Sequence, residues 1–141
     1  MEITEFDPNH LEPLRKLYLE SRVATFTWLD TQAYELSDFD RDTEGEEIWV
    51  AIESDEVVGF ISIWAADGFI HHLFVDPDFR KIGAGSQLVN LAKQRYSELS
   101  LKCFVQNSDA IGFYESQGFK AGETVENGAE SYHLMRFISH T

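Results

Sequence analysis

The sequence predicts an α/β fold, or α+β in the looser sense, in which helices flank one mixed and mostly antiparallel sheet. Short segments rich in β-branched and aromatic residues are separated by polar turns, which is typical of strands. Over residues 83–96 the spacing of apolar residues changes to the period of a helix. The length of 141 residues fits one domain, so we expect a single domain spanning residues 1–141.

The N-terminal part predicts an edge strand followed by a helix. Residues 2–6 alternate weakly between polar and apolar side chains. Asp7-Pro8 marks a helix start, because Asp accepts hydrogen bonds from free helical amides and Pro suits the first helical position. The helix should end near residues 22–24, and its apolar face holds Leu11, Leu14, Leu17 and Tyr18.

Residues 25–47 have a weaker pattern. Asp30-Thr31 has the character of a helix cap, and a short helix is expected to carry Tyr34, Leu36 and Phe39. The acidic stretch 38–47 is expected to be a loop.

Three antiparallel strands should then form a meander at the centre of the sheet. They are predicted at residues 49–53, 57–64 and 69–75. The polar turns Ser54-Asp55-Glu56 and Asp67-Gly68 separate them.

The second half continues with a helix, a strand, a helix and a closing pair of strands. The helix over residues 83–96 has an apolar face formed by Leu88, Leu91, Ala92 and Tyr96. A right-handed crossover should place the strand at 99–105 parallel to the strand at 69–75. Gly118 should stop the helix at 107–117. The closing strands are predicted at 119–123 and 131–137, with Asn127-Gly128 in the turn.

Composition and charge exclude several classes of partner. Eleven basic against 25 acidic side chains give a net charge of −14, so we expect no nucleic-acid partner. The acidity favours solubility and, secondarily, attraction of cationic substrates. No apolar run could cross a membrane, Cys103 is the only cysteine and no signal peptide is recognisable, so the expected location is the cytoplasm. His133 and His140 have no partners at metal-ligand spacing, so we expect no metal site.

A glycine loop lies between the end of a strand and the start of a helix. Gly83 and Gly85 would let an anion approach the free amides of the helix, where Arg80, Lys81 and Ser86 add donors. An ordinary tight turn explains the two glycines equally well. The loop lacks the Lys-Ser/Thr of a phosphate-binding Walker loop and the third glycine of a dinucleotide-binding loop.

Two motifs resemble the GNAT superfamily of N-acetyltransferases. Arg80-Lys81-Ile82-Gly83-Ala84-Gly85 is similar to that family's Arg/Gln-x-x-Gly-x-Gly/Ala signature, and it follows a strand ending in Leu73-Phe74-Val75-Asp76-Pro77. Asn107, Ala110, Phe113-Tyr114 and Gly118-Phe119 are similar to its second element. The resemblance covers residues 49–123.

The resemblance implies an acyl-CoA-dependent N-acyltransferase of GNAT-like fold that moves an acetyl group from acetyl-CoA to a primary amine of a small molecule or peptide. Tyr114 is implied as the donor of a proton to the CoA thiolate. The implied cofactor-binding residues are Leu73, Phe74, Val75, Arg80, Lys81, Ile82, Gly83, Ala84, Gly85, Ser86, Asn107 and Tyr114. The family pattern leaves two other functions open, a non-catalytic acyl-CoA-binding regulatory module and an enzyme for a longer or acidic acyl-CoA.

The general base and the acceptor pocket are less closely specified. His71 is the expected base, and His72 or a route through bulk water are its rivals. On an alternating strand His71 should share a face with Leu73 and Val75, with His72 on the other face. Phe26, Trp28 and Tyr34 are candidates to line the acceptor pocket, although each could equally be a core residue. We expect a monomer or a homodimer.

Overall fold

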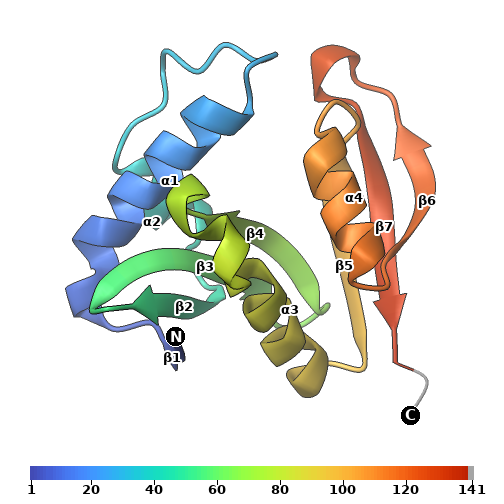
Figure 1. The fold of residues 1–141 in the computed structure, drawn as a ribbon. Coiled ribbons are helices and arrows are strands. Elements are labelled where there is room, and N and C mark those ends of the chain that lie inside the picture. Colours follow the sequence, from blue (N-terminus) through green and yellow to red (C-terminus); the bar gives the residue numbers. More distant parts are fainter. Residues whose placement is uncertain (140–141) are drawn as a thin grey trace.

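A computed structural model describes residues 1–139 of the chain, and His140 lies outside this range. Seven strands form one sheet in the order β1-β2-β3-β4-β5-β7-β6 (Figure 1). The strands are β1 (Glu2–Glu5), β2 (Glu47–Glu53), β3 (Glu56–Trp64), β4 (Phe69–Val75), β5 (Glu98–Phe104), β6 (Lys120–Val125) and β7 (Tyr132–Ile138). The helices are α1 (Leu11–Thr25), α2 (Asp38–Asp42), α3 (Ala84–Arg95) and α4 (Ser108–Ser116).

The predicted fold class is confirmed. Every strand pair is antiparallel except β4–β5, and helices flank the sheet. Most predicted elements lie within a few residues of their expected bounds, because their signals are local. Gly118 follows α4 with a φ of +92°, the left-handed conformation that ends a helix. Within residues 1–139, no helix has the length and apolar character needed to span a lipid bilayer.

Alternation along the strands separates two hydrophobic clusters, one on each face of the sheet. On one face, Val50 and Phe60 pack with Leu14 and Tyr18 of α1. On the other face, the buried residues include Ala51, Ile61, Leu88 and Tyr114, which joins α3 and α4 to the sheet. The helices on the two faces therefore hold β4 from both sides.

The one parallel pair in the sheet is very short. β4 and β5 are in register only at Phe69 with Ser100 and Ile70 with Leu101, after which the strands diverge. On its other side β4 stays paired to β3 as far as Val75. Among residues 1–139, the edge of β4 that faces β5 therefore has no strand partner over residues 71–75.

The prediction for residues 25–47 was wrong in two respects. Residues 26–37 form turns, so Tyr34 and Leu36 do not lie on a helix, and the acidic segment expected to be a loop contains α2. The side chain of Asp30 does accept a hydrogen bond from the amide of Gln32 at 3.0 Å, but this turn does not start a helix. α2 forms because tertiary contacts hold it, which no local pattern could reveal.

A buried ion pair fixes α2 against α1. Arg22 donates to Asp38 at 3.1 Å, and the side chains are 7% and 9% exposed. The Arg22 guanidinium lies 3.9 Å from the ring centroid of Tyr18 and 4.2 Å from that of Tyr34. Burial alone would raise the pKa of Asp38, but the amide of Glu35 and the guanidinium outweigh it and hold that pKa below its ordinary value.

This ion pair should make the stability of the fold sensitive to acid. The pKa of Asp38 is lowered in the folded state, so its stabilising effect is complete above the unfolded pKa of about 4 and is lost as the pH falls through the folded value. We expect Asp38→Asn to lower the free energy of unfolding at pH 7 by roughly 3 kcal/mol, because it leaves a buried guanidinium without its anion. Urea unfolding at pH 7 and pH 3 measures both effects, and the variant should lose less stability on acidification than the parent.

The matched control is Asp40→Asn on the same helix. Asp40 pairs with Arg15 at the surface, where solvent screens the interaction. A loss of stability in Asp40→Asn as large as that in Asp38→Asn would contradict the special role of the buried pair.

Candidate functional site

A cleft of about 720 Å³ opens where β4 and β5 diverge. Its walls come from the end of β4, the loop before α3, the start of α4 and the segment after α1. Of the residues expected to bind the cofactor or the acceptor, those that line it are Trp28, Leu73, Phe74, Val75, Arg80, Gly83, Gly85, Ser86, Asn107 and Tyr114. Sequence reasoning missed other lining residues, including Thr25, Thr27, Gln106 and Asp109, which have no distinguishing motif.

The glycine loop forms one end of the cleft. Gly83 has a φ of +82°, which favours glycine, and a Cβ placed there would meet no atom within 4 Å. The amide of Gln87 donates to the carbonyl of Gly83 at 3.0 Å, so the amides of residues 84–86 precede the first intrahelical bond of α3. Open space above free helical amides fits a phosphate group.

The two glycines of the loop have different structural roles. A Cβ on Gly85 would lie 3.2 Å from Cζ of Phe113, so this glycine allows α3 to approach α4. Ser86 accepts a hydrogen bond from Gln117 at 3.1 Å, which also ties the two helices together. The start of α3 is thus held against the wall formed by α4.

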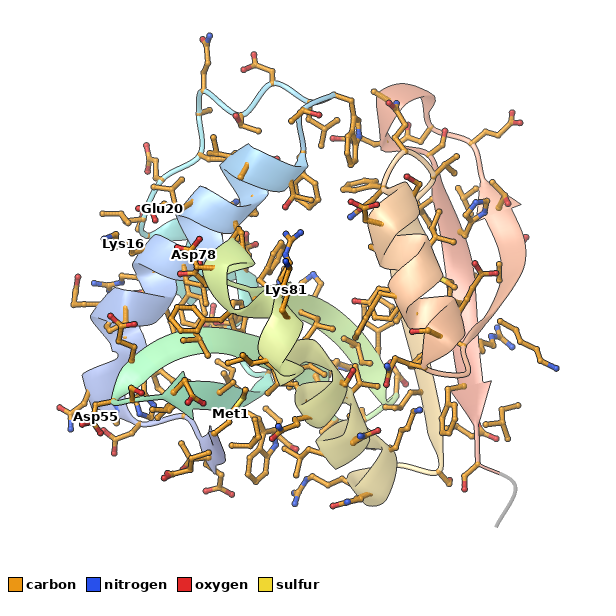
Figure 2. All side chains as sticks on the ribbon, viewed as in Figure 1. Met1, Lys16, Glu20, Asp55, Asp78 and Lys81 are labelled. Atoms are coloured by element: carbon orange, nitrogen blue, oxygen red, sulfur yellow. The ribbon has the colours of Figure 1, made fainter. Side chains whose placement is uncertain are left out.

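Three of the predicted phosphate-binding residues do not line the cleft. Lys81 and Ile82 are exposed on the turn before α3, where Figure 2 shows Lys81. Ala84 is fully buried in the core, so only its backbone amide remains for a ligand. Arg80 is the basic side chain of this loop that lines the cleft.

α4 supplies the opposite wall. The side-chain oxygen of Asn107 caps the helix by accepting from the amide of Ala110 at 3.3 Å, which leaves its NH₂ group to donate to a ligand. Tyr114 lines the cleft although it is only 9% exposed. Burial raises the pKa of its phenol, and the nearby Cys103 acts in the same direction. The hydroxyl therefore keeps its proton near neutral pH.

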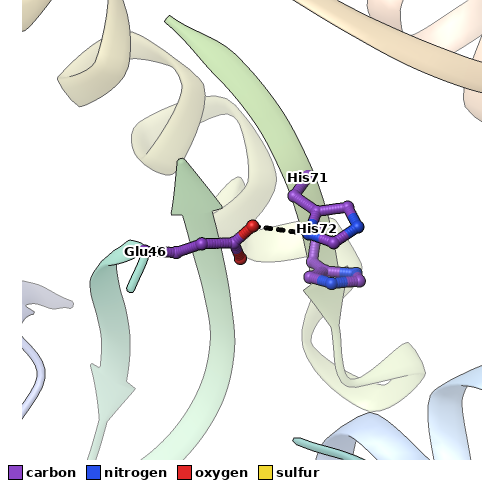
Figure 3. A group of neighbouring side chains, drawn as sticks. All are labelled: Glu46, His71 and His72. Atoms are coloured by element: carbon purple, nitrogen blue, oxygen red, sulfur yellow. Dashed lines mark hydrogen bonds and ion pairs between the residues drawn. The ribbon is translucent and has the colours of Figure 1, made fainter. Parts of the chain in front are cut away.

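A β-bulge in β4 changes the predicted arrangement of the two histidines. His72 pairs with Ser62 and Ile70 with Ile63, so His71 is the extra residue of the bulge. The two imidazole centroids are 3.9 Å apart, with an angle of 32° between the rings (Figure 3). The expectation of opposite faces was wrong because it assumed unbroken alternation.

The structure also brings Glu46 to this pair, from the loop before β2. Its Oε2 lies 2.5 Å from Nδ1 of His71 (Figure 3). His71 itself is 43% exposed and lies outside the lining of the cleft. Burial, with a smaller effect of His71, lowers the pKa of His72 to about 3, so its ring is neutral at pH 7. Glu46 could not be found from sequence, since 25 residues separate it from His71.

The three aromatic candidates for the acceptor pocket have different surroundings. Trp28 lines the cleft. Phe26 contacts both diverging strands, with ring centroids 6.2 Å from Phe74 and 5.2 Å from Phe104. Tyr34 stacks on Arg22 instead. Trp28 is therefore the one of the three that the structure brings to the cleft.

Comparison with known proteins gives a consistent result. The model of the acetyltransferase (GNAT) family matches residues 11–119. The peptidyl-lysine N-acetyltransferase YjaB of Escherichia coli K12 is 37% identical over 112 residues, which cover 77% of this chain and 75% of that protein. The peptidyl-lysine N-acetyltransferase YiaC of the same organism is 37% identical over 71 residues, covering 50% of this chain and 48% of YiaC.

Solved structures extend the likeness to the whole fold. The solution structure of apo-form YjaB from Escherichia coli matches with a TM-score of 0.73 and 27% identity, over 99% of this chain and 97% of that one. The PaiA N-acetyltransferase from Thermoplasma acidophilum, in complex with coenzyme A, matches with a TM-score of 0.78 over 97% of this chain and 98% of that one. Its identity is 21%, so this second likeness shows the fold alone.

Proposed function

Because the chain belongs to the GNAT family of acetyltransferases, which use acetyl-CoA, we propose that it transfers the acetyl group to the side-chain amine of a lysine in a peptide or protein. The observation that carries the proposal is the cleft between β4 and β5, with the open glycine loop at one end and Tyr114 on its wall. The names of the bacterial relatives YjaB and YiaC support lysine as the acceptor. The net charge of −14 favours a cationic acceptor.

The donor half of the cleft suits acetyl-CoA in three ways. The free amides of residues 84–86 and Arg80 would hold the pyrophosphate. The unpaired edge of β4 over Leu73 to Val75 would bond to the pantetheine arm and the thioester carbonyl. The NH₂ group of Asn107 would bond to the same arm.

The reaction needs proton transfers at the nitrogen of the acceptor and at the sulfur of the donor. A lysine ammonium must first lose a proton, and His71, the exposed imidazole at the bulge of β4, is our assignment for its acceptor. The neutral amine then forms a C–N bond with the thioester carbon, and a backbone amide at the end of β4 stabilises the oxyanion. As the C–S bond breaks, Tyr114 gives its proton to the departing thiolate, and the proton that the nitrogen loses as the amide forms returns the tyrosinate to its neutral form. His72 is a poor proton acceptor, because burial lowers its pKa to about 3.

Gly83→Leu should weaken acetyl-CoA binding roughly tenfold or more, because its side chain would occupy the space assigned to the pyrophosphate. Isothermal calorimetry measures the affinity. Gly128→Leu is a matched control: Gly128 also has a positive φ, of +56°, with no atom near its Cβ, but it lies outside the cleft lining. Both variants should lose a similar stability of about 1–2 kcal/mol from backbone strain. Equal acetyl-CoA affinities in the two folded variants would refute the placement.

Tyr114→Phe should lower kcat by about 100-fold with little change in the KM for acetyl-CoA, because the change removes the proton donor and keeps the ring. Steady-state kinetics at saturating acetyl-CoA provides the measurement. Tyr96→Phe is the control, since it removes a hydroxyl that bonds to Glu47, outside the cleft lining. If Tyr114→Phe turned over as fast as Tyr96→Phe, the thiolate would have another proton donor.

The acceptor can be identified with paired peptides and a thiol-release assay. A peptide with a free lysine and a blocked N-terminus should release CoA, and the same peptide with Nε-acetyl-lysine should not. Mass spectrometry locates the acetyl group. The KM for a lysine-rich peptide should rise as salt is added, because salt screens the attraction to the acidic protein.

Two other results would each reject lysine transfer. Acetylation only of a free N-terminus would make the enzyme an Nα-acetyltransferase. Tight acetyl-CoA binding without turnover on peptides, polyamines, amino acids or aminoglycosides would instead indicate a non-catalytic binding module.

A further inference from the structure

The contact between Glu46 and His71 has the form of a carboxylate–imidazole dyad. Glu46 is 6% exposed, whereas His71 is 43% exposed, so a buried carboxylate holds an imidazole that water can reach. We propose that Glu46 is the positioning residue of the proton acceptor His71, fixing the tautomer of its ring and stabilising the imidazolium that forms when an amine loses its proton. This inference rests on the proposed function, because it deepens the role given there to His71.

Hydrogen-bond chemistry dictates the tautomer. A carboxylate only accepts hydrogen bonds, so Nδ1 of His71 donates to Oε2 of Glu46 across their 2.5 Å contact. The other nitrogen, Nε2, is then left with its lone pair to receive a proton. In the triads of hydrolases, a buried carboxylate likewise fixes the tautomer of an imidazole that accepts the proton. Proton transfer would convert the ring to imidazolium and the ammonium to a neutral amine, so charge is conserved.

The surroundings favour this pairing over others. Oε1 of Glu46 is buried without a hydrogen-bond partner among residues 1–139, so the bond from His71 to Oε2 is the hydrogen bond that these residues give to its carboxylate. On the other side of His71 lies the neutral ring of His72, whose Nε2 is 3.3 Å from the backbone carbonyl oxygen of Asp42. The positive charge of Arg22 also contributes to the lowered pKa of His72. His71 is therefore the hydrogen-bond partner of Glu46 in this cluster.

The cluster has the composition of a metal site but not its geometry. The ligand atoms of Glu46, His71 and His72 lie within 4.8 Å of one another. Two imidazoles on one Zn²⁺ must point their nitrogens at a common atom about 2.1 Å away. Here the ring planes are tilted by 32° with their centroids 3.9 Å apart, an arrangement in which the rings lie largely face to face and do not point edge-on at a common atom. The arrangement suits proton exchange.

The tautomer can be tested on the wild-type protein without any turnover. At pH 8, two-dimensional ¹H–¹⁵N spectra of the imidazoles, assigned with His71→Gln, should show His71 with a protonated Nδ1 and an unprotonated Nε2. Glu46→Gln should mix the two tautomers, because an amide can either donate or accept. Glu44→Gln, an exposed neighbour on the same loop, should leave the spectrum unchanged. A protonated Nε2 in the wild type would overturn the dyad.

A double-mutant cycle tests its part in the reaction. We expect Glu46→Gln to lower kcat at least about tenfold with an unchanged KM for acetyl-CoA, since neither residue lines the cleft. In the His71→Ala background the same change should have less than about a twofold effect, because the residue it positions is gone. Equal effects of Glu46→Gln in both backgrounds would overturn the proposal, as would an unaltered rate in His71→Ala. Neither result would contradict acetyl transfer itself. Absence of turnover in the wild-type protein would reject the proposed function, and the NMR spectra would then be the remaining test of the dyad.

Discussion

The site exists because β4 and β5 stop pairing before β4 ends. Two parallel strands that paired along their full length would leave no opening in the sheet and no free backbone groups within it. Here the pairing stops at Ile70 and Leu101, while β3 continues to hold β4 as far as Val75. Unpaired backbone inside a sheet carries a free-energy cost unless something bonds to it. The fold therefore contains a slot whose walls are suited to an extended polar ligand.

The parts around the slot keep it open. On one face, the ring of Phe26 packs against Phe74 of β4 and Phe104 of β5. On the other face, Gly85 lets α3 rest on Phe113 of α4. Packing on both sides thus supports the divergence of the two strands.

Features with local signals could be predicted from the sequence, and features made by distant contacts could not. The meander, the glycine loop and the helix ended by Gly118 follow from spacing and turn chemistry within a few residues. α2 was missed because its five residues are held by a buried pair to Arg22. The bulge at His71 was missed because regular alternation was assumed along β4, whereas the register is decided by the partner strand. Glu46 was missed for the same reason, since only the folded chain brings it to β4.

The hydrogen bonds at Arg22 and Asp38 affect which residues of the segment between α1 and α2 can be substituted. The segment between α1 and α2 is fastened at its start, where the amide of Phe26 donates to the carbonyl of Arg22, and at its end, where the amide of Glu35 donates to Asp38. A segment tied at both ends can change its middle residues without loosening the sheet beneath it. Residues 29–33 can therefore be substituted at little cost to the stability of the fold, because the hydrogen bonds at the two ends of the segment do not involve their side chains.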